Sequence, residues 1–211
     1  MDQSPGNLIV ISAPSGAGKT SLVRALISRM ENIAASVSHT TRTCRPGEED
    51  SIDYFFVTES EFQKMIADGD FLEHAKVFGN LYGTSLTQIE RTVTNGTDLL
   101  LEIDWQGARA IRTNYPQTVS IFILPPSEAT LKKRLIDRGM DGPDVINQRM
   151  QAAMGEISHF NEYEFLVVND NFERAFEELC LIIRACRLKT APQRTRLHSK
   201  LRSLMASADT L

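Results

Sequence analysis

Residues 8–20 read LIVISAPSGAGKT, and this stretch decides the fold of the 211-residue chain. The apolar run Leu8–Ser12 predicts a buried strand, and Thr20 begins a helix after a loop of small residues. Glycines in such a loop let successive backbone N–H groups approach an anion, and the helix N-terminus adds partial positive charge. The lysine reaches the β- and γ-phosphates, and the threonine hydroxyl can bind Mg²⁺. The stretch therefore predicts a phosphate loop for a nucleoside triphosphate, made of Ala13, Pro14, Ser15, Gly16, Ala17, Gly18, Lys19 and Thr20.

The composition is that of one compact globular domain with small insertions. The chain is 42% hydrophobic and has a net charge of -4, which argues against nucleic-acid binding through bulk charge. No apolar run approaches the roughly 20 residues that span a bilayer, and the acidic N-terminus does not resemble a secretory signal. The three cysteines form no CxxC pair and indicate reduced thiols. We expect a cytoplasmic protein that binds neither nucleic acid nor membrane.

Strand and helix patterns alternate along much of the chain, which predicts an α/β fold. Short buried strands are expected at 8–12, 99–103, 119–124 and 165–168, with helices at 20–30 and 172–189. In the first helix we expect Leu22, Leu26 and Ile27 to face inward. The order predicts a parallel sheet of the phosphate-loop NTPase type with helices on both faces. Residues 1–36, 88–126 and 160–190 would form this core.

Two segments interrupt the rhythm and predict insertions. Residues 37–87 carry short strand-like pieces at 37–41 and 54–57 and a helix that opens with the capping box Thr58–Glu61. A short helix is expected after Ser85. Residues 127–159 predict a helix after Ser127, a turn at 139–143 and a second helix near 144–159.

Carboxylates and arginines at particular positions suggest a phosphoryl-transfer site. Glu102 and Asp104 end a buried strand, share a face if the strand is regular, and with Thr20 predict a Mg²⁺ site. Arg134 and Arg138 share one helix face and Arg149 lies on the next helix, where they would stabilise charge on a transferred phosphate; spacing alone favours surface ion pairs instead.

The C-terminal part of the chain is basic. Seven lysines and arginines and no acid lie between Arg184 and Arg202. A solvated helix end followed by a frayed terminus is the simplest prediction for residues 191–211. Contact with an anion, or self-association into a homo-oligomer, is the alternative.

Six segments in order resemble the bacterial guanylate kinase family. They are residues 13–20, Ser38–Arg45, Phe71–His74, Gly79–Thr84, Glu102–Gly107 and Val167–Asp170, and the resemblance spans about residues 7–190. It implies MgATP + GMP ⇌ ADP + GDP, with residues 37–87 as a GMP-binding lobe, 127–159 as a lid, and Mg²⁺ as cofactor.

The same resemblance implies roles for individual residues. The GMP phosphate would meet Arg42, Arg45, Tyr54 and Tyr82. Guanine would meet Ser38, Glu73 and Thr84, with Asp104 close to the nucleotide. Lys19, Arg134, Arg138 and Arg149 would surround the transferred phosphate, and Asn169 would contact the ATP adenine.

Two other functions compete with this interpretation. A non-catalytic binding module of the same fold would bind phosphopeptides, but such modules lose parts of the phosphate loop, and here Lys19 and Thr20 are present. A kinase for another monophosphate is the second alternative. Against it, a carboxylate such as Glu73 accepts from the two adjacent donors of guanine, which adenine lacks.

Overall fold

The computed structural model describes residues 5–77, 79–137 and 142–208. Its main sheet has five parallel strands in the order β2-β7-β1-β8-β9. They are β1 (Leu8–Ser12), β2 (Ile33–Ala35), β7 (Asp98–Glu102), β8 (Val119–Leu124) and β9 (Phe165–Val168). The predicted α/β fold class is confirmed. Three of the four predicted strands have the expected bounds, and the strand predicted at 99–103 begins and ends one residue earlier.

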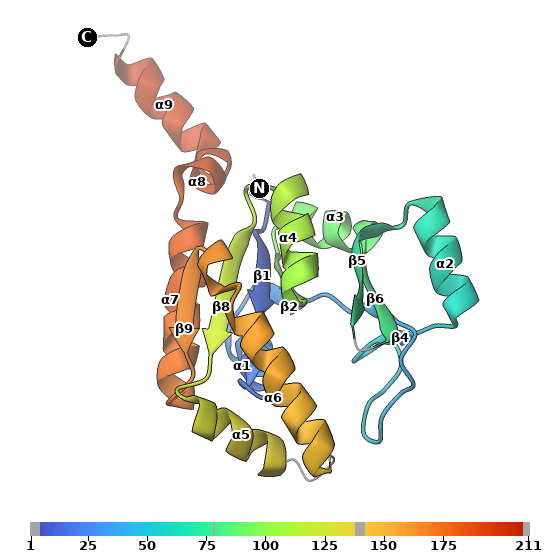
Figure 1. Ribbon diagram of the computed structural model, residues 1–211. Coiled ribbons are helices and arrows are strands. Elements are labelled where there is room, and N and C mark those ends of the chain that lie inside the picture. Colours follow the sequence, from blue (N-terminus) through green and yellow to red (C-terminus); the bar gives the residue numbers. More distant parts are fainter. Residues whose placement is uncertain (1–4, 78, 138–141, 209–211) are drawn as a thin grey trace.

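Helices cover both faces of this sheet (Figure 1). Helices α1 (Lys19–Arg29) and α7 (Phe172–Arg187) pack on the face that buries Ile9 and Ile11 of β1. Helices α3 (Leu86–Thr94) and α4 (Trp105–Asn114) pack on the opposite face, which buries Val10. Because alternate residues of β1 point to opposite faces and both faces are covered, the strand is apolar without interruption.

One core prediction is wrong. Leu22 and Leu26 are buried, but Ile27 is 41% exposed. The buried face of α1 is completed by Val23, and Met30 packs against the same cluster. A turn of 100° per residue carries position 27 out of this face, whereas 23 and 26 lie within it.

A second, smaller sheet lies beside the main one in Figure 1. Its strands follow the order β4-β3-β6-β5, with β3 (His39–Thr40), β4 (Phe55–Phe56), β5 (Phe71–Val77) and β6 (Asn80–Ser85). Helix α2 (Glu59–Asp68) packs Phe62 against Phe71 of β5 and has the predicted Thr58–Glu61 capping box. The pairing of β5 with β6 runs antiparallel from Phe71–Ser85 to Val77–Asn80.

Two helices form a separate small cluster below the sheet in Figure 1. They are α5 (Glu128–Asp137) and α6 (Pro143–Ile157), and the 3₁₀ turn η1 (Phe160–Glu162) follows them. Leu131 and Leu135 of α5 pack with Ile146, Met150 and Ala153 of α6. The predicted turn at 139–143 falls mostly on residues 139–141, which lie outside the described residues.

The basic C-terminal segment forms two helices, α8 (Thr190–Arg196) and α9 (His198–Ala208). The prediction of a frayed terminus is therefore wrong for the described part. Leucine, lysine, arginine, methionine and alanine dominate α9, and these residues have high helix propensity. Helix α9 extends away from the rest of the molecule (Figure 1). Among the described residues no helix is long and apolar enough to cross a bilayer, and all three cysteines are free thiols.

A buried carboxylate joins the N-terminal segment to α7. Asp98, at the start of β7, is 2% exposed. One oxygen accepts from the backbone N–H and the side-chain amide of Asn7, at 2.6 and 2.8 Å, and the other accepts from Nε of Arg187 at 2.7 Å. Three segments far apart in the sequence therefore meet at one side chain.

Removing this carboxylate should destabilise the fold. We expect Asp98→Ala to lower the free energy of unfolding by about 3 kcal/mol, because it leaves the Arg187 guanidinium without its counter-ion and the Asn7 donors without their acceptor. Urea denaturation measures the change. Asp68→Ala is the control, since Asp68 forms an exposed ion pair with Lys64 at 3.3 Å and should change stability by less than about 0.5 kcal/mol. Equal losses in the two variants would contradict the role of Asp98.

Candidate active site

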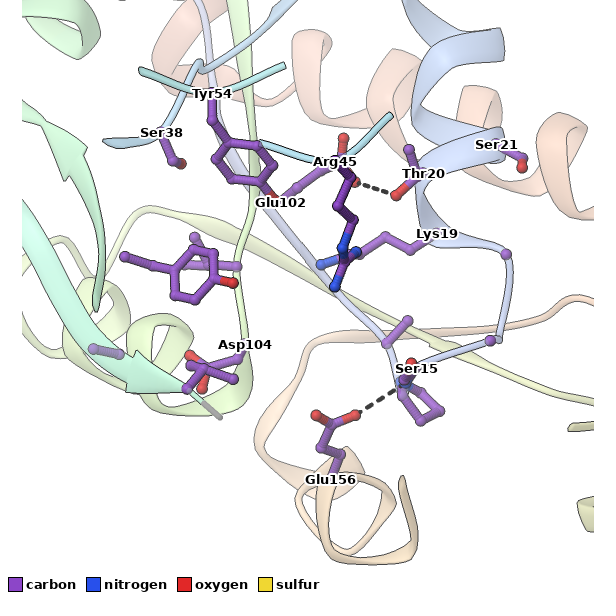
Figure 2. A pocket seen from close by; sticks show the side chains of 18 of the residues that line it. Ser15, Lys19, Thr20, Ser21, Ser38, Arg45, Tyr54, Glu102, Asp104 and Glu156 are labelled. Carbon is purple, nitrogen blue, oxygen red and sulfur yellow. Dashed lines mark hydrogen bonds between the residues drawn. The ribbon is translucent and has the colours of Figure 1, made fainter. Parts of the chain in front are cut away.

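A cavity of about 410 Å³ opens at the carboxyl ends of β1 and β7. Ligands of parallel α/β sheets bind at this edge. Figure 2 shows the side chains that converge on it from the main sheet, from the second sheet and from α6. Most of the predicted site residues line the cavity: Ala13, Pro14, Ser15, Gly16, Gly18, Lys19, Thr20, Ser38, Arg45, Tyr54, Glu73, Tyr82, Glu102, Asp104 and Arg134.

Other predicted site residues do not line the cavity in the described part of the chain. Arg149 lies on α6, and Ala17 is a fully buried residue of the phosphate loop. Thr84 donates to the lining residue Glu73, and Asn169 donates to Ala17. Arg42 lies over the ring of the lining residue Tyr54. Arg138 lies outside the described residues.

The loop between β1 and α1 has a backbone that only glycine adopts without strain. Gly16 and Gly18 have φ angles of 91° and 94°, in the left-handed region. Space for a side chain is also limited: a Cβ on Gly18 would clash with Nδ2 of Asn169 at 2.4 Å, and one on Gly16 would lie in a tight contact, 3.1 Å from Leu131 and Leu135. The loop is therefore packed against α5 and the end of β9, which fixes the direction of its N–H groups.

Two side chains hold the loop from below. The Asn169 amide donates to the Ala17 carbonyl at 2.7 Å. Arg134 of α5 donates to the same carbonyl at 3.3 Å and to the Asn169 carbonyl at 2.9 Å. Asn169 is 5% exposed, so in this structure its side chain supports the loop.

A hydroxyl and a carboxylate face each other across the cavity floor. The Thr20 hydroxyl donates to Oε2 of Glu102 at 3.2 Å (Figure 2). Oxygen donors of this kind suit Mg²⁺, which keeps several waters and substrate oxygens in its shell. Asp104 lies beyond the end of β7 and caps α4, where Oδ1 accepts from the backbone N–H of Gly107 at 2.9 Å. The regular strand assumed for Glu102 and Asp104 therefore stops at Glu102.

The second sheet supplies the opposite wall. Ser38, Arg45, Tyr54 and Tyr82 line it, and the two tyrosine rings meet edge to face with centroids 6.0 Å apart. Burial, together with the charge of Glu102, raises the pKa of Tyr54 to about 12. Its phenol therefore remains protonated at neutral pH and can donate a hydrogen bond to an anion.

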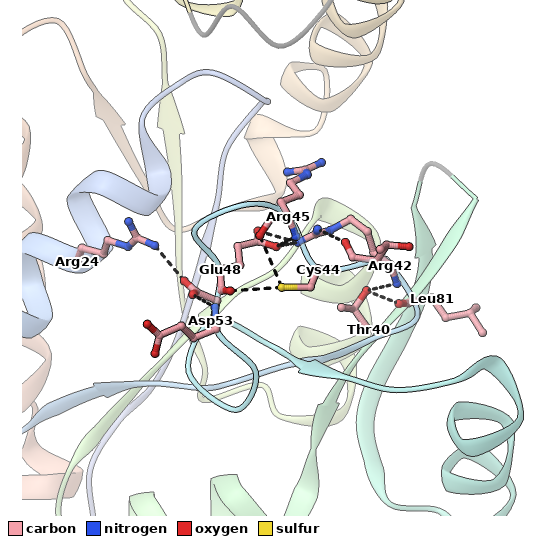
Figure 3. Close-up of polar contacts among 10 residues, drawn as sticks. Arg24, Thr40, Arg42, Cys44, Arg45, Glu48, Asp53 and Leu81 are labelled. Carbon is pink, nitrogen blue, oxygen red and sulfur yellow. Dashed lines mark hydrogen bonds and ion pairs between the residues drawn. The ribbon is translucent and has the colours of Figure 1, made fainter.

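Arg42 is engaged by an acid of its own loop (Figure 3). Its guanidinium donates to both oxygens of Glu48, at 2.8 and 2.9 Å, and the Arg45 backbone N–H donates to the same carboxylate at 2.8 Å. An ion pair at 3.0 Å between Arg24 of α1 and Asp53 links this loop to the core. In this structure, Arg42, which was predicted to bind the GMP phosphate, is therefore bound to the carboxylate of Glu48 instead.

Glu73 is a buried acid. It is 6% exposed, and the Thr84 hydroxyl donates to its Oε1 at 2.6 Å. Burial raises the pKa of Glu73 to about 7, against the opposing effect of that hydrogen bond. Its other oxygen lies near Gly107, where an added Cβ would come within 2.6 Å of Oε2. A carboxylate in this position is costly unless a ligand donates to it.

Known proteins with the same sequence pattern identify the family. The family model described as guanylate kinase matches residues 5–186. Guanylate kinases of Hahella chejuensis and Pseudomonas syringae pv. tomato are each 52% identical, over 96% and 98% of this chain and 97% and 100% of theirs. A crystal structure of guanylate kinase from Anaplasma phagocytophilum superposes with a TM-score of 0.76 at 37% identity, covering 94% of this chain and 96% of that one. The chain belongs to the guanylate kinase family.

The predicted resemblance to guanylate kinases is thus confirmed, but sequence reasoning missed several lining residues. They are Ser21, Ala75, Val77, Ile103 and Glu156. Glu156 of α6 is the one with a charge, and its Oε2 accepts from the Ser15 backbone N–H at 3.2 Å. Burial raises its pKa, while Lys19 and this hydrogen bond oppose the shift. Its spacing of seven residues from Arg149, two helical turns, was a signal that could have found it.

The raised pKa of Glu73 predicts a pH-dependent stability difference. Between its ordinary pKa of 4.5 and about 7, the folded state holds a proton that the unfolded state has lost. Stability contributed by this group therefore falls as pH rises through that window and levels off above it. We expect Glu73→Gln to be nearly neutral at pH 4.5 and to stabilise the protein by up to about 3 kcal/mol at pH 8.

Urea titrations of wild type and Glu73→Gln across pH 4.5–8 measure that difference. The exposed variant Glu128→Gln serves as the control and should show a pH-independent difference. A constant gap between wild type and Glu73→Gln would contradict the shifted pKa.

Proposed function

We propose that this cavity aligns ATP and GMP for direct transfer of the γ-phosphoryl group, giving ADP and GDP. Membership of the guanylate kinase family makes the chain an ATP:GMP phosphotransferase. The observation that carries the residue assignment is the meeting, in one cavity, of a phosphate loop with a wall of hydroxyls, an arginine and the buried acid Glu73.

The triphosphate would bind on the loop side. Backbone N–H groups of residues 15–20 and the Lys19 ammonium would hold its β- and γ-phosphates. Thr20 and Glu102, with Asp104 nearby, would hold Mg²⁺, which when bound neutralises charge on these phosphates. Arg134 lines the same side, while Arg138 and Arg149 stay predictions for the transferred group. Residues 127–159 would act as the lid.

The monophosphate would bind against the second sheet, with residues 37–87 as its lobe. Arg45, Tyr54 and Tyr82 would hold the GMP phosphate, and Arg42 would join them by exchanging its bonds to Glu48 for bonds to phosphate. Ser38, Thr84 and Glu73 would read guanine, whose N1–H and 2-amino group are adjacent donors. Adenine lacks both and would leave the buried carboxylate unpaired.

The chemistry needs no strong base from the protein. The nucleophile is a phosphate oxygen with a second pKa of about 6, and it is largely ionised at neutral pH. What remains for the protein is to align two anions and to stabilise charge in the transition state. Enclosure by the lid would limit transfer to water.

The decisive experiment measures ADP formation from MgATP with GMP, AMP, CMP and UMP in parallel. We expect turnover with GMP, and Lys19→Ala should lower kcat by about 100-fold or more while GMP binding is retained, because the lysine acts on the phosphates of ATP. Folded protein that binds GMP but turns over no acceptor would instead support a phosphopeptide-binding module. Equal turnover of all four acceptors would contradict the guanine assignment.

Base selectivity tests Glu73 separately. Glu73→Gln should lower the ratio of kcat/KM for GMP to that for AMP by at least about tenfold, since a neutral amide accepts less strongly from guanine. The change should appear mainly as a higher KM for GMP with little effect on the KM for ATP. The matched control is Glu61→Gln on α2, an exposed capping acid that does not line the cavity. An unchanged ratio would remove Glu73 from the recognition site.

A further inference from the structure

Helix α6 places a carboxylate where the proposed mechanism puts a phosphate. Oε2 of Glu156 accepts the Ser15 N–H of the phosphate loop at 3.2 Å, and the side chain points into the cavity (Figure 2). An acid at this point repels a bound triphosphate, so the transfer reaction itself does not explain it. A loop that carries Lys19 and directs the Ser15 N–H into the cavity is, however, stabilised by an anion.

The charges around Glu156 both attract and repel its carboxylate. Lys19 attracts the carboxylate, whereas Asp104 repels it. Both groups also line the cavity. Binding of a triphosphate would bring several more negative charges beside Glu156, and these charges would compete with it for the same donors.

Displacement of Glu156 would shift α6 as a unit. Ile146, Met150 and Ala153 on one side of this helix pack against Leu131 and Leu135 of α5. Those two leucines contact the loop at Gly16. Arg149 lies two turns from Glu156 on the same side of the helix, so a shift that withdraws one of these side chains also moves the other.

We propose that Glu156 is a positioning residue: its carboxylate occupies the anion site of the phosphate loop until the triphosphate of ATP displaces it, and this displacement repositions α6 and Arg149 over the transferred phosphate. This inference rests on the proposed function, because it requires that ATP binds this loop. The contact between Glu156 and Ser15 would thus act as a latch: binding of ATP to the phosphate loop would release it and change the position of α6.

The chain's single tryptophan reports on this movement. Trp105 stacks on His159, two residues after the end of α6, with ring centroids 3.7 Å apart and planes 10° from parallel. Repositioning of α6 should change this stack and hence the Trp105 fluorescence. Trp105 follows Asp104, which is assigned close to GMP, so a titration with GMP alone measures how much the acceptor by itself changes the signal.

The test titrates wild type and Glu156→Gln with a magnesium complex of a non-hydrolysable ATP analogue, followed by calorimetry and by Trp105 fluorescence. The amide keeps the shape of the side chain but removes its charge. We expect about fivefold tighter binding of the analogue, because charge-assisted hydrogen bonds are about twice as strong as neutral ones. The affinity for GMP should stay unchanged, and the fluorescence of the free variant should lie nearer to the nucleotide-bound value.

Two further variants sharpen the result. Glu156→Ala, which removes the acceptor altogether, should also tighten analogue binding. Asp144→Asn makes the same charge change near the start of α6, away from the cavity lining, and should leave both affinities unchanged. Unchanged or weaker analogue binding by both Glu156 variants, with an active wild type, would overturn the latch alone. If the wild type bound no analogue and made no ADP, the proposed function would fall as well.

Discussion

The fixed shape of the phosphate loop is the constraint on which the rest of the site depends. Gly16 and Gly18 adopt left-handed angles with little room for a Cβ, and the Ser15 N–H faces the cavity, where it donates to Glu156. Asn169 and Arg134 hold the loop from below through the Ala17 carbonyl. The donors are therefore aligned before any anion arrives, and binding does not have to supply the free energy of ordering them.

Hydrogen-bond donors that are fixed in place are unfavourable unless they have acceptors. Two carboxylates reduce that cost: Glu48 satisfies Arg42 and the Arg45 N–H, and Glu156 satisfies the Ser15 N–H. Glu48 lies in a loop beside the second sheet, and Glu156 lies on α6. Because both acids occupy groups assigned to phosphates, each substrate would exchange hydrogen bonds with the protein rather than form them anew.

The features that could be predicted from the sequence are those that depend on local sequence patterns. The buried strands, the capping box at Thr58 and the phosphate loop each depend on a few neighbouring residues. The sequence did not predict β5 and β6, because their mixed burial gives no regular alternation. Nor did it predict the contact of Asn169 with Ala17, since contacts between segments more than 100 residues apart follow from packing rather than pattern. The bond of Arg42 to Glu48, six residues on, depends on the path of an irregular loop, which has no periodic pattern.

Glu73 shows how packing between distant segments can give a glutamate the ability to discriminate between ligands. Its carboxylate is buried against the first turn of α4, at a point that only Gly107 leaves open, and Thr84 provides its one hydrogen-bond donor in the described structure. Burial, the largest influence on this acid, raises its pKa to about 7, so it is about half protonated at neutral pH. A ligand with two adjacent N–H donors favours the ionised form and gains charge-assisted bonds, whereas a ligand without them meets a desolvated acid. The same burial that makes ionised Glu73 costly therefore becomes the source of selectivity when guanine is bound.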